Sequence, residues 1–284
     1  MTVFCLGSIN ADYVYHVPHL PEPGETLKAT SFEVGLGGKG CNQSIAAARA
    51  GARVVHIGAI GASDDWVIDL LTKDGINTDH IHRSEDKIGH AIINVDEVGE
   101  NAIVIYEGAN ADQSKARINA ALTQGKSGDI LLLQNETTCQ VEAAKIARAQ
   151  GMDVYYSAAP FDLTAVEAVL PYATLLLMNE GENAQFEAEF TTRPARLITK
   201  GSKGAVWTDG KDTISVDAFN VKAVDTTAAG DCFAGYFAAQ MDAGTDIKSA
   251  MRMAAAASAL KVTRDGAASG IPALTDVKTY LKQH

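Results

Sequence analysis

Short apolar runs rich in β-branched residues alternate along the chain with alanine-rich stretches. Apolar runs of this length are typical of parallel strands that are buried on both faces. Alanine-rich stretches that end at Gly51 and Gly151 predict helices over residues 42–50 and 141–150, because glycine readily adopts the left-handed conformation that ends a helix. Strands are expected at residues 3–9, 54–60, 129–134, 154–157, 175–178 and 197–199, and further helices at 231–243 and 246–262. This alternation predicts an α/β fold, with a mostly parallel sheet between two layers of helices as a three-layer αβα sandwich.

Two segments interrupt the alternation with extended sequence. Residues 13–34 contain Pro18, Pro21 and Pro23, and residues 88–107 alternate around the turn-forming Val98-Gly99-Glu100-Asn101. We expect both segments to form a small antiparallel sheet that projects from one edge of the main sheet and acts as a lid. The whole chain, residues 1–284, is expected to be a single domain that includes this lid.

The composition is that of an ordinary globular protein, with 46% hydrophobic and 21% charged residues. A net charge of -11 argues against binding to nucleic acid or to an anionic membrane, because both need basic patches. No apolar stretch reaches the roughly 18 residues that a membrane helix needs, and the N-terminus lacks the features of a secretory signal. The widely spaced cysteines are expected to be reduced thiols of a cytoplasmic protein: Cys5, Cys41, Cys139 and Cys232.

Polar residues follow several of the predicted strands directly. In an open α/β sheet, ligands bind beyond the carboxyl ends of the strands. Asn, Asp and Glu at such positions more often form turns or cap helices, so each residue alone is a weak signal. Because these residues recur at one edge of the sheet, we expect a ligand site there. They are Asn10, Asp12, Asn135, Glu136, Asn179, Glu182 and the segment Thr199-Lys200-Gly201-Ser202.

A glycine-rich segment precedes the first predicted helix. It reads Gly35-Leu36-Gly37-Gly38-Lys39-Gly40-Cys41-Asn42. Its glycine spacing fits neither the Walker A loop nor the dinucleotide-binding fingerprint, and neither Ser nor Thr follows Lys39. Glycines before a helix allow the backbone to approach a ligand at the positive end of that helix. A tight connection with one exposed lysine is the alternative interpretation, but it gives no reason for so many glycines.

A second motif places small residues before a predicted helix near the C-terminus. It reads Asp225-Thr226-Thr227-Ala228-Ala229-Gly230-Asp231. Free N–H groups in the first turn of such a helix can stabilise the charge on a phosphoryl group during its transfer. Asp231 could cap the helix, which stabilises a protein by about 1 kcal/mol, or accept a proton from an attacking hydroxyl. Together with the glycine-rich segment, the motif favours the catalytic base.

These two motifs resemble the two signatures of the PfkB (ribokinase-like) family of carbohydrate kinases. The matching residues are Gly37-Gly38-Lys39-Gly40-Cys41-Asn42-Gln43 and Asp225-Thr226-Thr227-Ala228-Ala229-Gly230-Asp231. The resemblance extends over essentially the whole chain and is strongest to the ribokinase branch of the family. Other matching segments are Gly7-Ser8-Ile9-Asn10-Ala11-Asp12, Pro23-Gly24-Glu25-Thr26, Gly108-Ala109-Asn110 and Val262-Thr263-Arg264 with Gly266-Ala267.

The resemblance also implies roles for individual residues. It implies that the sugar hydroxyls bind Asn10, Asp12, Gly38, Lys39, Asn42 and Glu136, and that the lid residues Ala91 and Ile93 cover the sugar. Asp231 is implied to be the catalytic base, and Ala228, Ala229 and Gly230 the anion hole. On the nucleotide side, the implied residues are Asn179 and Glu182 for phosphate and Mg²⁺-bound water, and Thr199, Gly201, Ser202 and Gly204 for the nucleotide itself. A monovalent-cation site, for K⁺, is implied at Asp225, Thr227, Lys261, Arg264, Gly266 and Gly270.

Two departures from the family pattern bear on these roles. The segment between Asn179 and Thr199 is shorter than in typical ribokinase-like proteins, which implies one helix fewer beside the nucleotide. Gly270 stands where the family commonly has Ser, and Lys261 brings a positive charge to the implied cation site. The sequence therefore leaves the requirement for K⁺ open.

The resemblance implies an ATP-dependent sugar kinase, with conversion of ribose to ribose 5-phosphate as the expected reaction. Asp12 and Asn42 favour a small polyhydroxylated sugar over a nucleoside. A deoxypentose, a hexose, a keto-sugar acid or a nucleoside is the alternative acceptor. A non-catalytic sugar or nucleotide sensor is disfavoured, because a sensor needs neither Asp231 nor an anion hole. We also expect a homodimer formed through the lid.

Overall fold

The strands form two sheets in the computed structural model, which describes residues 1–192 and 194–284. The larger sheet of the described chain has nine strands in the order β13-β12-β11-β10-β9-β8-β1-β4-β5. Neighbours from β11 to β5 pair in parallel, and only the edge strands β12 and β13 pair antiparallel to their neighbours. The strands are β1 (Val3–Leu6), β4 (Val54–Gly61), β5 (Asn77–Ser84), β8 (Ile130–Leu133), β9 (Asp153–Ser157), β10 (Leu175–Asn179), β11 (Arg196–Thr199), β12 (Ala205–Thr208) and β13 (Thr213–Val216). The prediction of a mostly parallel sheet is confirmed.

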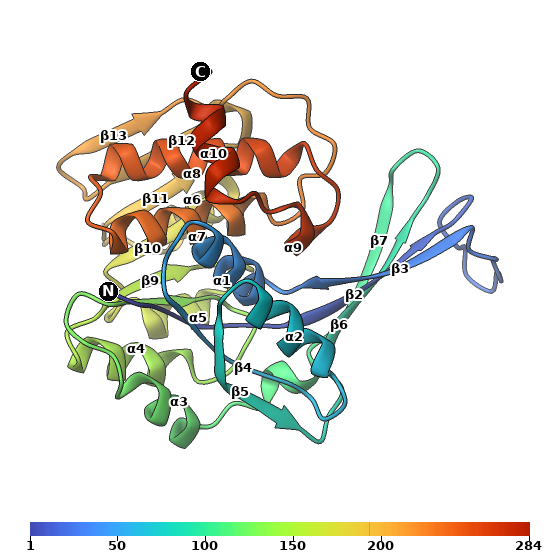
Figure 1. Cartoon of the computed structure of the whole chain (residues 1–284), viewed down its shortest axis with the longest axis horizontal. Helices are drawn as coiled ribbons and strands as arrows, with labels where there is room; N and C mark the ends of the chain where they lie inside the picture. The colour runs from blue at the N-terminus through green and yellow to red at the C-terminus, as the bar shows by residue number, and fades with distance from the viewer. Residues whose placement is uncertain (193) are drawn as a thin grey trace.

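Helices cover both faces of this sheet (Figure 1). Successive residues of the central strand β1 point to opposite faces, so Val3 and Cys5 belong to one apolar core and Phe4 and Leu6 to the other. The first core is covered by α1 (Lys39–Arg49), α2 (Asp65–Lys73), α7 (Ala229–Asp242), α8 (Ile247–Val262), α9 (Ala267–Gly270) and α10 (Leu274–Leu281). The second is covered by α3 (Lys115–Leu122), α4 (Gln140–Ala149), α5 (Leu163–Val169) and α6 (Glu180–Glu189). The αβα layering is confirmed.

The smaller sheet projects from one side of the molecule (Figure 1). Its order is β3-β2-β6-β7, formed by β2 (Asn10–His16), β3 (Ser31–Gly37), β6 (Gly89–Val95) and β7 (Asn101–Tyr106). The expectation of a wholly antiparallel sheet was wrong, because β2 and β6 pair in parallel. Each of them follows a parallel strand of the main sheet, β1 or β5, and therefore leaves it in the same direction.

The predicted strand over residues 3–9 is divided between the two sheets. The strand β1 ends at Leu6 and β2 begins at Asn10. At the bend, a Cβ atom on Gly7 would lie 2.4 Å from the Cα atom of Gly40, so only glycine allows the chain to turn there beside α1. The bend carries Asn10 and Asp12 from the edge of the main sheet onto the smaller one. None of the helices within the described ranges is both long enough and apolar enough to cross a membrane.

Candidate active site

Asp231 lies where the helices α1 and α7 meet at the carboxyl edge of the main sheet. Its Oδ1 atom accepts a hydrogen bond from Nε2 of Gln43 at 3.1 Å, and its Oδ2 atom accepts one from Nδ2 of Asn42 at 3.3 Å. The interpretation of Asp231 as a helix cap is wrong, because Ala228 occupies the N-cap position in a left-handed conformation (φ 58°). The Asp231 carboxylate thus lines a pocket and is oriented by side chains from another helix.

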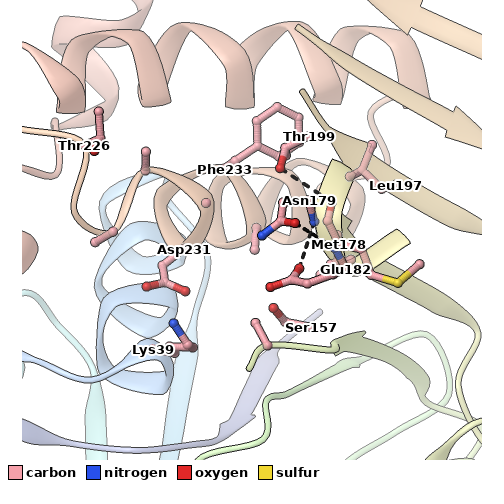
Figure 2. A pocket seen from close by; sticks show the side chains of 16 residues that line it. Lys39, Ser157, Met178, Asn179, Glu182, Leu197, Thr199, Thr226, Asp231 and Phe233 are labelled. Carbon is pink, nitrogen blue, oxygen red and sulfur yellow. Dashed lines mark hydrogen bonds between the residues drawn. The ribbon is translucent and has the colours of Figure 1, made fainter. Parts of the chain in front are cut away.

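The charge of Asp231 is influenced by its buried setting. Burial raises the pKa of Asp231, while the ammonium of Lys39 and the hydrogen bond from Gln43 lower it. Desolvation is the largest of these effects, so the pKa of Asp231 is raised overall. Burial by itself would lower the pKa of Lys39, but the nearby carboxylates, Asp231 first, raise it. A charged Lys39 points towards Asp231 across the pocket (Figure 2).

The first turn of α7 presents backbone N–H groups to the same pocket. The Ala229 amide donates to the carbonyl of Thr226 at 3.2 Å, and the Cys232 amide donates to the carbonyl of Ala228 at 2.8 Å. Among the described residues, no backbone acceptor is found for the amides of Gly230 and Asp231. Ala228, Ala229 and Gly230 all line the pocket, so this turn can receive an anion through the two remaining donors.

The carboxylates of Asp12 and Glu136 lie near the bend between β1 and β2, where the smaller sheet begins. The pKa of Asp12 is raised to about 6, mainly by burial and to a smaller extent by the charge of Glu136. Glu136 accepts hydrogen bonds from the Ser8 hydroxyl and from the Lys39 amide, and its Oε1 atom lies 3.7 Å from the Lys39 ammonium. Asn10 is held by Asn110, whose Nδ2 atom donates to the Asn10 Oδ1 atom at 2.7 Å.

Asn42 has a buried acceptor without a partner. Its side chain is 4% exposed, and its Oδ1 atom accepts no hydrogen bond from any described residue. Because buried polar atoms are nearly always satisfied, this oxygen is available to a hydroxyl of a bound ligand. Ala91 and Ile93 lie on the same face of the smaller sheet as Asp12, since Asp12 is paired with Ala91 and Val14 with Ile93. This face of the smaller sheet therefore combines a carboxylate with two apolar side chains.

Three glycines of the first motif stand where a side chain would collide with neighbouring protein atoms. A Cβ atom on Gly40 would lie 2.3 Å from the Cα atom of Gly7, and one on Gly37 would lie 2.2 Å from the Asp12 Oδ2 atom. Gly38 has φ 90°, and a Cβ there would lie 2.7 Å from the Ser8 carbonyl oxygen. These glycines allow the bend between β1 and β2 and thereby position Asp12, while sugar binding at Gly38 stays a prediction.

Asn179 and Glu182 form a capping box at the start of α6. The Glu182 amide donates to Oδ1 of Asn179, and the Asn179 amide donates to Oε2 of Glu182, both at 2.8 Å. Burial raises the pKa of Glu182, against the smaller lowering by the Asn179 hydrogen bond and by Lys39. Both side chains also line the pocket with Asp231, and Glu182 lies across it from Asp231 (Figure 2).

The predicted nucleotide turn is only partly joined to this pocket. Thr199 lines it, whereas Gly201, Ser202 and Gly204 belong to the adjoining 3-10 turn (Gly201–Lys203) and its end. Gly204 packs against the main sheet, because a Cβ atom there would lie 2.0 Å from the Val216 carbonyl oxygen. The segment between Asn179 and Thr199, which the sequence predicts to be short, contains α6 as the one described helix between β10 and β11.

Among the six residues predicted to hold a monovalent cation, Lys261 and Asp225 bind each other directly. The Lys261 ammonium lies 3.0 Å from the Asp225 carbonyl oxygen and 3.1 Å from the Asp225 Oδ2 atom. Thr227 donates its amide to Asp225 Oδ1, and the Arg264 side chain turns away to Asp276. Gly266 (φ 81°) is the N-cap residue of α9, and Gly270 is the last residue of that helix.

Sequence analysis did not identify the residue that orients the proposed base, which is Gln43. Gln43 accepts a hydrogen bond on its Oε1 atom from Nε2 of Gln134 at 2.7 Å, and donates one to Asp231. Gln43 is fully buried, although it directly follows the motif residue Asn42. A buried glutamine beside a motif residue is the signal that could have pointed to this role.

The chain is similar to known carbohydrate kinases over nearly its whole length. Residues 2–274 match the profile described as pfkB family carbohydrate kinase. The ribokinase of Haemophilus influenzae is 35% identical over 99% of this chain and 98% of its own length. The crystal structure of ribokinase from Thermotoga maritima superposes with a TM-score of 0.88 at 34% identity, covering 99% of both chains. Arabidopsis thaliana ribokinase complexed with ribose and ATP superposes with a TM-score of 0.87 at 26% identity, covering 99% of this chain and 98% of that one. The protein belongs to the pfkB family of carbohydrate kinases, which are phosphotransferases with an alcohol group as acceptor.

Proposed function

We propose that the protein is a ribose kinase, which transfers the γ-phosphate of ATP to a hydroxyl of ribose and forms ribose 5-phosphate. The position of Asp231 carries this proposal. Its carboxylate accepts a hydrogen bond from Asn42 and lines the same pocket as the first turn of α7. In that turn, the amides of Gly230 and Asp231 have no backbone acceptor among the described residues. The identity to ribokinases and the superposition on a ribokinase complexed with ribose and ATP support ribose as the acceptor.

On the sugar side, each proposed contact uses a group with spare hydrogen-bonding capacity. The unpartnered Oδ1 atom of Asn42 accepts from one sugar hydroxyl, and the ionised Asp12 carboxylate accepts from others. Asn10, Glu136, Lys39 and the backbone at Gly38 complete the polar surface. Ala91 and Ile93 cover the apolar face of the sugar from the smaller sheet. This arrangement presents one hydroxyl to Asp231.

On the nucleotide side, the proposed phosphate contacts are the amides of Gly230 and Asp231 and the ammonium of Lys39. The Thr199 side chain and the turn at Gly201, Ser202 and Gly204 are proposed to hold the rest of ATP. No cluster of three metal-ligating side chains is found within the described ranges. This agrees with the behaviour of Mg²⁺, which is usually held by substrate phosphates, water and one or two carboxylates. Glu182 fits that role through water, because its Oε2 atom is already bonded to Asn179.

The proposed reaction relies on positioning and charge stabilisation. Asp231 accepts the proton of the sugar hydroxyl as its oxygen attacks the γ-phosphorus, while Gln43 and Asn42 hold the carboxylate in place. The amides of the α7 turn then stabilise the developing negative charge. Closure of the smaller sheet over the sugar excludes water, which would otherwise compete as acceptor. In this proposal one kinase domain spans residues 1–284, with residues 13–34 and 88–107 as its lid.

A panel of acceptors tests the substrate. We would measure ADP release with Mg-ATP and ribose, 2-deoxyribose, fructose, a keto-sugar acid and adenosine, and identify each product by mass spectrometry. The proposal predicts the highest kcat/KM with ribose. A higher value with another sugar would reassign the substrate within the family. Binding of ribose without ADP release from any acceptor would favour a sugar sensor instead.

We also propose a homodimer formed through the smaller sheet. Its outer face carries Tyr13, Tyr15, Phe32, His90 and Tyr106, whose rings contact one another in pairs. Phe32 and Tyr106 are 49% and 47% exposed, and a second copy would cover them. Sedimentation velocity tests this, because the proposal predicts a dimer and a monomer would refute it.

A cytoplasmic location is proposed from the four free cysteines, and the net charge of -11 favours neither nucleic acid nor membrane as partner.

A further inference from the structure

A fully buried lysine lies behind the loop that leads to Asp231. Lys261, near the end of α8, is 0% exposed, which is rare for lysine unless the charge is paired. Its ammonium donates to the carbonyl oxygen of Asp225 at 3.0 Å and to its Oδ2 atom at 3.1 Å. One residue, Asp225, therefore provides both a backbone and a side-chain oxygen to this buried cation.

Gly270 makes room for the lysine. A Cβ atom at position 270 would lie 3.1 Å from Lys261 Cε, closer than such contacts normally are. The same Cβ would lie 3.3 Å from the carbonyl oxygens of Arg264 and Asp265. A side chain at this position would therefore compete with Lys261 for the same space. Lys261 and Gly270 fit each other as a pair.

The lysine is linked to the proposed anion hole by a short series of hydrogen bonds. The Asp225 Oδ1 atom, on the carboxylate that Lys261 binds, accepts from the Thr227 amide at 2.8 Å. The amides of Val224 and Asp225 donate to the Val262 carbonyl at 2.7 and 3.1 Å, which fixes the loop on the end of α8. The carbonyl of Thr226 then accepts from the Ala229 amide in the first turn of α7. The position of Lys261 thus sets the conformation of the turn that carries Gly230 and Asp231.

A bound K⁺ does not fit this arrangement. The Asp225 oxygens that would coordinate such an ion already bind the Lys261 ammonium. A second positive charge within the same turn would be repelled by the lysine, and the buried setting would make that repulsion strong. Among the residues that the structure describes, Lys261 pairs with the carboxylate of Asp225 alone, so their charges balance without another cation.

We infer that the Lys261 ammonium is a built-in monovalent cation, which holds the Asp225–Thr227 loop and through it the first turn of α7. Lys261 is a positioning residue, since it touches neither of the proposed substrates. The inference rests on the proposed kinase activity for its kinetic consequence. Its structural consequence, that the protein needs no K⁺ to order this loop, does not depend on which sugar is phosphorylated.

The test begins with the wild-type protein, stripped of K⁺ and assayed with the Tris salt of ATP. We expect kcat to change by less than about twofold when tetramethylammonium chloride is replaced by KCl at the same ionic strength. Lys261→Met retains an apolar stem and removes the charge, and it should lower kcat on the order of 100-fold through misplacement of the α7 turn. KCl should restore much of this loss and raise the melting temperature of this variant, but not of the wild type, by about 2–4 °C.

A second variant checks the geometry by chemical rescue. Lys261→Ala removes three carbons and the ammonium, the atoms of a propylammonium ion. Propylammonium should therefore restore its activity, and tetramethylammonium, which has no N–H donor, should not. Lys248→Ala, an exposed lysine on the same helix, is the matched control and should respond to neither cation.

Two results would overturn the inference. One is strong activation of the wild type by K⁺, which would show a separate cation site. The other is a Lys261→Met variant that folds and keeps wild-type kcat and melting temperature without K⁺. If neither protein phosphorylates any sugar, the proposed function fails, but the cation-dependent melting temperature of the variant still tests the role of Lys261.

Discussion

The Asp231 carboxylate is held at 3.1 Å by the side-chain amide of Gln43, a residue on a different helix. Gln43 is fixed in turn by Gln134 from the end of β8, at 2.7 Å. The proposed base is therefore oriented before any substrate binds. This preorganisation costs nothing at the moment of reaction, which is the condition under which positioning accelerates phosphoryl transfer most.

Removal of the Gln43 amide should slow the reaction without weakening sugar binding. Gln43→Met keeps the volume but removes the hydrogen bond to Asp231, which as a bond to a charged group is worth about 1.5–3 kcal/mol. We expect kcat to fall about tenfold or more, with sugar Kd within about twofold of wild type. Steady-state kinetics and calorimetry measure the two quantities. An unchanged kcat in the folded variant would show that Gln43 does not orient the base.

Sugar binding should depend on the ionisation of Asp12. The pKa of Asp12 is raised to about 6 in the free protein, so the carboxylate is largely protonated at pH 5 and ionised at pH 7. If the ionised form binds the sugar, affinity is full above pH 6 and weakens by up to about tenfold per pH unit as the pH falls below it. Calorimetric titrations with sugar but without ATP, from pH 5 to pH 8, measure this change.

Asp12→Asn is the control for that dependence. It should bind sugar more weakly and lose most of the change with pH, whereas Asp231→Asn should retain it. The same raised pKa makes the free protein less stable above pH 6 than below it, because the folded state binds the proton more tightly than the unfolded state. A flat binding profile in the wild type would exclude Asp12 as the ionising contact.

Glu182 should affect the use of Mg²⁺ more than the stability of α6. Glu182→Gln keeps an oxygen that can accept from the Asn179 amide, so the free energy of unfolding should change by less than about 0.5 kcal/mol. Loss of the charge should raise the Mg²⁺ concentration needed for half-maximal rate about tenfold. Glu180→Gln, in the same helical turn, removes an equal charge and should leave the Mg²⁺ dependence unchanged.

The glycine motif supplies a prediction on stability. In Gly40→Ala, the new Cβ would lie 2.3 Å from Gly7 Cα, so the backbone must shift and the protein should lose about 1–3 kcal/mol of stability. Gly35→Ala is the matched control, because its Cβ has no neighbour closer than 3.9 Å and its effect should be below about 0.5 kcal/mol. Denaturant unfolding compares them. Equal stabilities would contradict the packing role of Gly40.

The sequence predicted the parallel sheet because its strands are apolar throughout, as in Leu131-Leu132-Leu133. It missed the edge strands β12 and β13, whose mixed composition gives no comparable signal. It also could not show the direction of β6 relative to β2, because that depends on where each strand leaves the main sheet. The hydrophobic pattern therefore predicts the layers of the fold, whereas the strand directions in the smaller sheet depend on chain connectivity.

Motif spacing led to the predictions for Asp231 and Asn42, but it could not separate packing from binding. The sequence predicts that the motif glycines let the backbone approach a ligand, whereas the structure places other protein atoms against Gly37 and Gly40. Likewise, Asn179 was weighed as a helix cap or a phosphate residue, and it is a cap that also lines the pocket. Such double roles depend on contacts between distant segments, which no local pattern encodes. Lys261 beside Asp225 is another contact of this kind.

The central claim, that Asp231 is the base of a sugar kinase, is tested most directly by Asp231→Asn. Asparagine keeps the size and one of the two oxygens that accept from Gln43 and Asn42, but it cannot accept the proton. We predict that kcat for ADP formation with ribose falls by roughly 10²–10⁴-fold while the Kd for ribose changes little. Turnover close to that of the wild type in the folded variant would contradict the account.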